Sequence, residues 1–179
     1  MTLGIYMGSF NPPHKGHLEI VNYLLKNNYV DKVLIVPTLS YWDKDISVCV
    51  EDRINMLRFF ETDNIIIDDK HNKYIYTYEL VMKLRESYPN YELSIIIGAD
   101  NIINLDKWKN YKELLNYNII VMNRNNIDIE KYVKKYQGNF TIINDYKGID
   151  ISSTELRKKL SSKYLDKRVI EYINNHHLY

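Results

Sequence analysis

The sequence has few of the residues that cross-link a chain or interrupt it. Among 179 residues there are one cysteine, four prolines and six glycines. A lone Cys49 excludes an internal disulfide and a cysteine-rich zinc site, and it is typical of a reducing compartment, so a cytoplasmic protein is expected. We also find no repeat, low-complexity segment or linker, which favours one domain over residues 1–179.

Charge of one sign and long hydrophobic runs are missing too. The 24 Lys and Arg residues against 23 Asp and Glu residues give a net charge of +1. Because no basic stripe stands out, nucleic acid is not an expected partner. No apolar run reaches transmembrane length, and residues 1–10 lack a basic start followed by a long apolar segment. Neither a membrane partner nor a signal peptide is therefore expected.

What the sequence does contain is an alternation of short apolar runs and amphipathic segments. The runs at residues 3–7, 32–36, 64–67, 93–97, 118–122 and 140–143 are typical of strands covered on both faces. Helical periodicity appears at residues 17–25, 54–60, 80–84, 110–115, 130–136, 154–160 and 167–174. This alternation predicts an α/β fold: a Rossmann-like, doubly wound parallel sheet with flanking helices.

A doubly wound sheet also predicts where a ligand binds. In the strand order 3-2-1-4-5-6, the first and fourth strands are neighbours, and ligands bind beyond their carboxyl ends. The residues after these two strands are GSF at 8–10 and GAD at 98–100. We therefore expect the site between these two segments.

The first segment continues into the string GSFNPPHKGH, residues 8–17, directly before an amphipathic stretch. Gly8 lets the backbone approach a ligand, and Pro12 and Pro13 fix where the helix starts. His14 and His17 share one face of the helix N-terminus, where free N–H groups and the helix dipole favour an anion. The pattern predicts a triphosphate site without a P-loop.

Two other interpretations of the histidines stay open. His17 falls on the apolar face and could be a core histidine, and the pair could bind zinc. Against zinc, no cysteine is nearby and there is no HExxH pattern. The complete string after a strand favours the phosphate role.

A second string, ISSTELR at residues 151–157, opens a helix near the end of the sequence. Ser152 and Glu155 fit a capping box, which would only stabilise the helix start. Arg157 follows Ser153 by four residues on the same face, so hydroxyls, N–H groups and a guanidinium could converge on one phosphate. The two roles are compatible.

Together, GSFNPPHKGH and ISSTELR resemble the paired signatures of the nucleotidyltransferase superfamily with HxGH and ISSTxxR motifs. Within it, the chain is most similar to the bacterial nicotinate mononucleotide adenylyltransferases, over almost its whole length. The further matching segments are Pro37-Thr38, Lys44, residues 51–57, Tyr76-Thr77-Tyr78, residues 97–100, Trp108, residues 121–124 and residues 169–179. The resemblance implies transfer of AMP from ATP to nicotinate mononucleotide, which forms deamido-NAD and pyrophosphate in NAD biosynthesis.

The resemblance also implies roles for individual residues. Those implied to bind ATP are Gly8, Ser9, Phe10, His14, His17, Gly98, Asp100, Ile151, Ser152, Ser153, Thr154 and Arg157. Those implied to bind the acceptor are Ser9, Phe10, Lys44, Tyr76, Thr77 and Trp108. The nicotinate ring would stack on Trp108, with Thr77 near its carboxylate. The catalytic role, charge stabilisation at the phosphates, goes to His14, His17, Arg157 and Lys44. As alternatives, Trp108 could be plain core and Thr77 a helix cap.

Such a reaction requires no general base, because the acceptor phosphate is already an anion that can attack the α-phosphorus of ATP. Mg²⁺ is expected to be held through the ATP phosphates rather than by a protein metal site. Other readings stay open: a phosphopantetheine or nicotinamide mononucleotide acceptor, a CTP-dependent relative, or a non-catalytic nucleotide sensor. A dehydrogenase is disfavoured because the first turn lacks GxGxxG. A homo-oligomer would fit the family.

Overall fold

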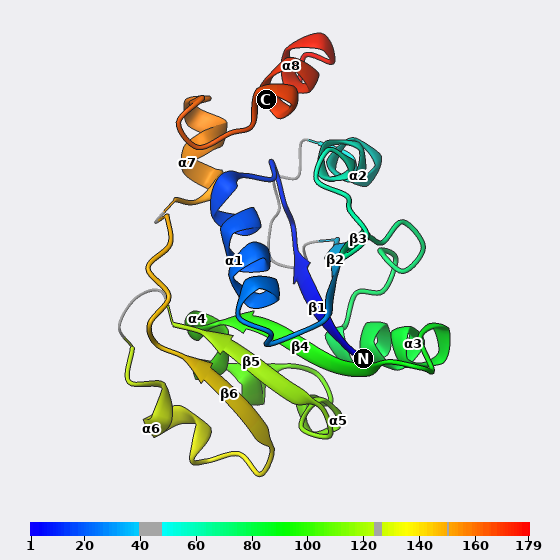
Figure 1. The fold of residues 1–179 in the computed structure, drawn as a ribbon, viewed down its shortest axis with the longest axis vertical. Coiled ribbons are helices and arrows are strands. Elements are labelled where there is room, and N and C mark those ends of the chain that lie inside the picture. The colour runs from blue at the N-terminus through cyan, green and yellow to red at the C-terminus, as the bar shows by residue number, and fades with distance from the viewer. Residues whose placement is uncertain (40–47, 124–126, 150) are drawn as a thin grey trace.

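The computed structural model describes residues 1–39, 48–123, 127–149 and 151–179. Its centre is a six-stranded parallel sheet in the order β3-β2-β1-β4-β5-β6 (Figure 1). The strands are β1 (Thr2–Gly8), β2 (Lys32–Pro37), β3 (Ile65–Ile67), β4 (Glu92–Gly98), β5 (Asn118–Met122) and β6 (Asn139–Ile143). The predicted strands and their order are confirmed, with bounds that differ by at most one residue at either end.

Helices connect the strands and follow the last of them. They are α1 (Lys15–Lys26), α2 (Val50–Arg58), α3 (Thr77–Ser87), α4 (Ala99–Ile103), α5 (Tyr111–Leu114), α6 (Ile129–Val133), α7 (Ser153–Lys158) and α8 (Lys167–Asn175). A 3₁₀ turn, η1 (Leu105–Lys107), follows α4. The sequence prediction missed α4 and η1, because each is too short to show a helical period. None of the helices within the described ranges is long and apolar enough to cross a bilayer.

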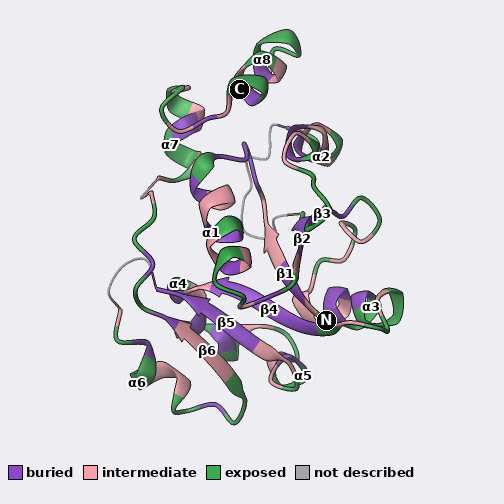
Figure 2. Cartoon of the chain, in the orientation of Figure 1, coloured by how far each residue is buried: buried purple, intermediate pink, exposed green. Residues whose placement is uncertain are grey.

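The strands are buried on both faces, as their continuous apolar runs predicted. On β2, Leu34 and Val36 belong to an apolar layer that includes α3, whereas Val33 and Ile35 belong to a layer that includes α1. Successive strand side chains point to opposite faces, so each strand contributes to both layers. Figure 2 shows β2 and β4 largely buried, β1 buried in its first half and intermediate toward its carboxyl end, and the helices exposed on their outer sides.

A third apolar cluster joins the last two helices to α2. Met56 of α2 packs with Leu156 of α7 and with Val169 and Ile173 of α8. In Figure 1, α7, α8 and the C-terminus lie beyond the end of β1, where β1 leads into α1. The cluster therefore holds the C-terminal helices at the carboxyl edge of the sheet, where the ligand site is predicted.

Candidate functional site

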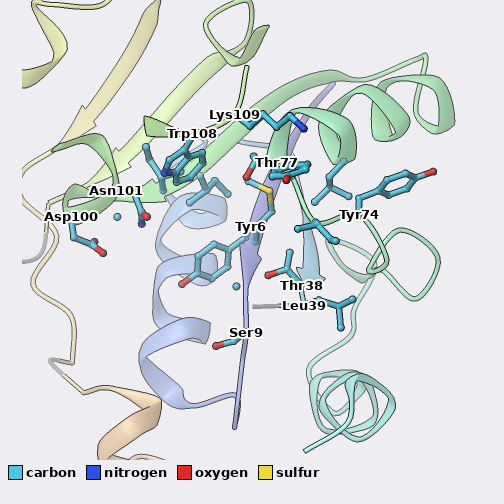
Figure 3. Close-up of a pocket in the computed structure, with 18 of the residues that line it drawn as sticks. Tyr6, Ser9, Thr38, Leu39, Tyr74, Thr77, Asp100, Asn101, Trp108 and Lys109 are labelled. Carbon is cyan, nitrogen blue, oxygen red and sulfur yellow. The ribbon is translucent and has the colours of Figure 1, made fainter. Parts of the chain in front are cut away.

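A cavity of about 630 Å³ opens at the carboxyl edge of the sheet, between the ends of β1 and β4. Figure 3 shows Ser9 at one end of this cavity and Trp108, Thr77 and Lys109 at the other. The predicted site residues in its lining are Gly8, Ser9, Tyr76, Thr77, Gly98, Asp100 and Trp108. The cavity lies at the switch point that the strand order predicts.

The two histidines stand at the start of α1; neither lines this cavity, but the His17 ring lies 6.3 Å, centroid to centroid, from that of the lining residue Tyr6. His14 is buried at 2% exposure and is the N-cap residue of α1, and its ring stacks on that of His17 with the ring centroids 3.6 Å apart. His17 Nδ1 accepts the His14 backbone N–H at 3.2 Å, which forms the reciprocal half of a capping box. Because Nδ1 is an acceptor here, the neutral His17 ring carries its proton on Nε2. The histidines thus serve the helix start and also present a nitrogen donor at its positive end.

Phe10 connects the histidines to the cavity-lining residue Gly8. Its ring is 1% exposed and meets the His17 ring edge-on at a centroid distance of 4.9 Å. A Cβ at Gly8 would lie 3.2 Å from Phe10 Cζ. The sequence predicted that glycine at this position serves close ligand approach. The structure shows that it also leaves room for the Phe10 ring.

Arg53 of α2 binds the segments that follow the carboxyl ends of β1 and β2. Its side chain is fully buried, and Nη1 donates to the Ser9 carbonyl at 2.6 Å and to the Thr38 carbonyl at 2.9 Å. Burial lowers the pKa of this guanidinium. Its Nε and Nη2 have no hydrogen-bond partner in the described part of the chain. Burying a charge is costly, and an apolar residue at this position could not donate the hydrogen bonds to the two carbonyls. These bonds are therefore the role of the arginine.

The sequence pointed to Arg53 only through the match at residues 51–57 and gave it no role. The signal that would have found it is a charged residue flanked by Ile54, Met56 and Leu57, all of which are buried. An arginine at such a position on a helix is a candidate for a buried hydrogen-bonding role.

The string ISSTELR performs the capping role predicted for it. Ser152 is the N-cap of α7 and forms a capping box with Glu155, and the hydrogen bond from the Ser152 side chain lowers the pKa of the Glu155 carboxyl. Ser153 Oγ donates to the Pro12 carbonyl at 3.0 Å. In this arrangement its single proton is used within the protein. The anion-binding role expected of the Ser153 hydroxyl stays a prediction.

Arg157 leans toward the start of α7, as its spacing predicted. Nη2 donates to Thr154 Oγ1 at 3.2 Å, and Nη1 donates to the Asn11 carbonyl at 2.8 Å. The second contact crosses from α7 to the loop that precedes His14. Arg157 therefore binds the loop as well as its own helix start, a contact that the sequence did not predict.

The far end of the cavity is aromatic and carries a positive charge. Tyr76 is the N-cap residue of α3, Thr77 is its first residue, and Trp108 follows η1 and is half-buried. The alternative reading of Thr77 as the cap is therefore wrong. Lys109 Nζ lies 4.2 Å from the centroid of the Tyr76 ring, at the rim beside Trp108 (Figure 3). A flat ring can stack on such surfaces, and a cation beside them attracts an anionic substituent.

A hydrogen-bonded chain holds the segment that leads to this wall. His71 contacts Asp68 through Nδ1 at 2.7 Å and Ser87 Oγ through Nε2 at 3.0 Å. Asp68 is 4% exposed. The chain ties residues 68–71 to the C-terminal end of α3. A Ser–His–Asp order is also found at activated nucleophiles, but these three residues do not line the cavity.

Lys44 and Arg124 fall outside the described residues, so the role predicted for Lys44 stays a prediction. Within the described ranges, no group of three or more His, Cys, Asp and Glu side chains is close enough to hold a metal ion.

Removal of the Arg53 guanidinium is expected to destabilise the fold. Arg53→Met keeps much of the side-chain volume but leaves the Ser9 and Thr38 carbonyls without their donor. It should lower the free energy of unfolding by about 2–4 kcal/mol in urea titrations. The control is Arg58→Met on the same helix, which breaks an exposed pair with Asp69 and should cost less than about 1 kcal/mol. Equal losses in the two variants would contradict an anchoring role for Arg53.

The comparisons with known proteins agree with this geometry. The family model described as cytidylyltransferase-like matches residues 5–159. A Fusobacterium nucleatum protein named "Probable nicotinate-nucleotide adenylyltransferase" is 38% identical over 91% of this chain and 89% of its own length. A Nitratiruptor protein of the same name is 36% identical over 97% of both chains.

A solved structure is similar as well. The Plasmodium falciparum nicotinic acid mononucleotide adenylyltransferase complexed with NaAD has a TM-score of 0.82 at 25% identity. The match covers 99% of this chain and 96% of that one. The resemblance that the HxGH and ISSTxxR strings carry is thereby confirmed at the level of family and fold. With a family model that matches most of its residues, this chain belongs to the cytidylyltransferase-like family.

Proposed function

We propose that this chain transfers the AMP moiety of ATP to the phosphate of nicotinate mononucleotide, with deamido-NAD and pyrophosphate as products. The observation that carries the proposal is a single cavity with two chemically different ends. One end is lined by Gly8 and Ser9, in the loop that leads to the two histidines of α1, and the other end is an aromatic slot with Lys109. The names of the relatives support the same reaction. In this proposal the protein is a cytoplasmic enzyme of NAD biosynthesis.

The phosphates of ATP belong at the start of α1 in this proposal. The backbone N–H groups of the first helical turn and the helix dipole attract anions there, and α1 carries no acidic residue in its first turn. His17 supplies an Nε2–H donor, because its Nδ1 is used as the acceptor at the helix start. Arg157 adds positive charge from α7 across the loop.

The reaction itself is an in-line displacement. An oxygen of the acceptor phosphate forms a bond to the α-phosphorus, and the bond from that phosphorus to the bridging oxygen breaks, so that pyrophosphate leaves with the electron pair. No proton has to be removed from the attacking oxygen. The work of the protein is therefore to align the two phosphates and to stabilise the negative charge that develops on the transferred and leaving groups.

Mg²⁺ fits this site as a companion of ATP. The described residues offer no carboxylate cluster, and Asp100 is the acidic residue in the cavity lining. A magnesium ion that keeps several waters and binds phosphate oxygens requires few protein ligands, and it would neutralise part of the phosphate charge.

The acceptor belongs at the aromatic end. Its ring would stack on Trp108, beside the N-terminus of α3 at Thr77. Lys109 would face a negative substituent on the ring, which favours the acid over the amide. This assignment agrees with the acceptor that the relatives' names contain.

The proposal is tested by measuring pyrophosphate release from ATP and Mg²⁺. Nicotinate mononucleotide, nicotinamide mononucleotide and phosphopantetheine are compared at equal concentration, and we expect kcat/KM to be highest for the first. A preference for phosphopantetheine would replace the acceptor and keep the reaction. Silence with all three acceptors, together with ATP binding, would leave a nucleotide sensor as the better interpretation.

The His17 ring should matter to turnover far more than to stability. We expect His17→Ala to lower kcat by at least about 100-fold, which is the scale for one preorganised donor at a developing charge. His176→Ala removes an exposed histidine at the C-terminal end of α8 and is the matched control. A His17→Ala enzyme that turns over at a near-normal rate while folded would show that the ring is a structural cap only.

Lys109 should set the preference for an acidic ring. Lys109→Met is expected to reduce the ratio of kcat/KM for nicotinate mononucleotide to kcat/KM for nicotinamide mononucleotide by about 5–10-fold, since it removes one exposed charge contact. A ratio within one preparation does not depend on the fraction of active enzyme. Lys112→Met on α5, outside the cavity lining, should leave the ratio unchanged. An unaltered ratio in Lys109→Met would assign acid recognition to other groups.

A further inference from the structure

Tyr179 reaches back from the end of α8 to the loop that carries the histidines. Its hydroxyl donates to Asn11 Oδ1. Asn11 is fully buried and stands three residues before His14. Contacts over 168 residues of sequence are not produced by local propensity, so this one depends on how α8 is docked.

Apolar contacts with α2 dock α8. Val169 and Ile173 are buried in the cluster with Met56 of α2, and Leu178 packs against the same cluster. The Leu178 N–H donates to the Ile173 carbonyl at 3.0 Å, and the chain turns at His177, where φ is 52°. After this turn Leu178 packs on the cluster and Tyr179 reaches the loop at Asn11.

Tyr179 is not a core residue, because 38% of its surface is exposed. Packing of the ring therefore does not explain why it lies against Asn11. The hydroxyl is nonetheless withdrawn from water: burial raises the pKa of the Tyr179 phenol, although Arg157 and Arg53 nearby oppose the shift. The phenol accordingly keeps its proton and remains a donor to Asn11 at any pH at which the enzyme would work.

The same loop is held at adjacent atoms from α7. Arg157 Nη1 donates to the Asn11 carbonyl at 2.8 Å and Ser153 Oγ donates to the Pro12 carbonyl at 3.0 Å. Both of these contacts fix main-chain atoms. Tyr179 supplies the side-chain contact, and without it the amide of Asn11 is buried with its oxygen unpaired.

We infer that Tyr179 is a positioning residue for adenylyl transfer: through Asn11 it sets the place of the loop that carries His14 and His17. Tyr179 does not line the cavity, and in this inference it acts on the reaction through the loop. The inference rests on the proposed function, because it assigns the histidines to the phosphates. A small displacement of a charge-stabilising group costs turnover more than it costs substrate binding.

The test compares two tyrosine-to-phenylalanine variants, one on α8 and one in the segment that follows it. Tyr179→Phe removes the bond to Asn11. Tyr172→Phe removes a hydroxyl that donates to Asp52 at 2.9 Å and accepts from Asn55 at 3.1 Å, with no contact to the loop. For each variant, kcat and KM are measured in pyrophosphate release from ATP, Mg²⁺ and nicotinate mononucleotide. The thermal midpoint of each is also measured, and the assays are run well below it.

We expect Tyr179→Phe to lower kcat about 10-fold, with KM for nicotinate mononucleotide within about twofold of wild type, since the aromatic end of the cavity is untouched. Tyr172→Phe should keep the wild-type kcat even if its thermal midpoint falls by as much as that of Tyr179→Phe. A kcat for Tyr179→Phe within twofold of wild type overturns the inference. So does a loss of kcat in Tyr179→Leu that Tyr179→Phe does not share, because the ring and not the hydroxyl would then act. An inactive wild-type protein would instead refute the proposed function.

Discussion

The hydrogen bonds from the buried Arg53 guanidinium are the contact on which the site depends. The Ser9 and Thr38 carbonyls come directly after β1 and β2, where the ladder that pairs these strands ends. One nitrogen of Arg53 binds both, and so fixes the separation of the two segments that leave the sheet. The same bonds stabilise the fold, because without the guanidinium both carbonyls would lose their donor.

The loop that begins at Ser9 is then held from the opposite side by elements far away in the sequence. Arg157 and Tyr179 bind Asn11, and the Lys15 N–H donates to the Tyr164 carbonyl at 2.8 Å. The histidines thus stand at the start of a helix, and the loop that leads into this helix is fixed at several points. Donors arranged before the substrate arrives do not have to be reoriented during the reaction, which is the main source of electrostatic catalysis.

The sheet was predictable because its information is local. A strand such as β2 is a continuous apolar run from Val33 to Val36. A parallel doubly wound sheet places the end of β1 beside the end of β4 without knowledge of any side-chain contact. Capping was predictable for the same reason, as Ser152 and Glu155 show. The roles of Arg53 and Tyr179 were not, because their partners lie 44 and 168 residues away. A sequence shows that an arginine stands among apolar residues, but not which carbonyls it meets.

Arg157 shows how a residue predicted for a ligand can also serve the protein. A guanidinium has five N–H donors in a planar fork. Among the described contacts, Nη1 binds Asn11 and Nη2 binds Thr154, so the fork retains donors for a phosphate oxygen. An anion bound there would be neutralised by the same group that holds the loop, and loop position and anion binding would stabilise each other. Substitution of Arg157 alone would mix the two effects. Tyr179 bears on the loop but not on the anion, and this difference allows positioning and charge stabilisation to be measured separately.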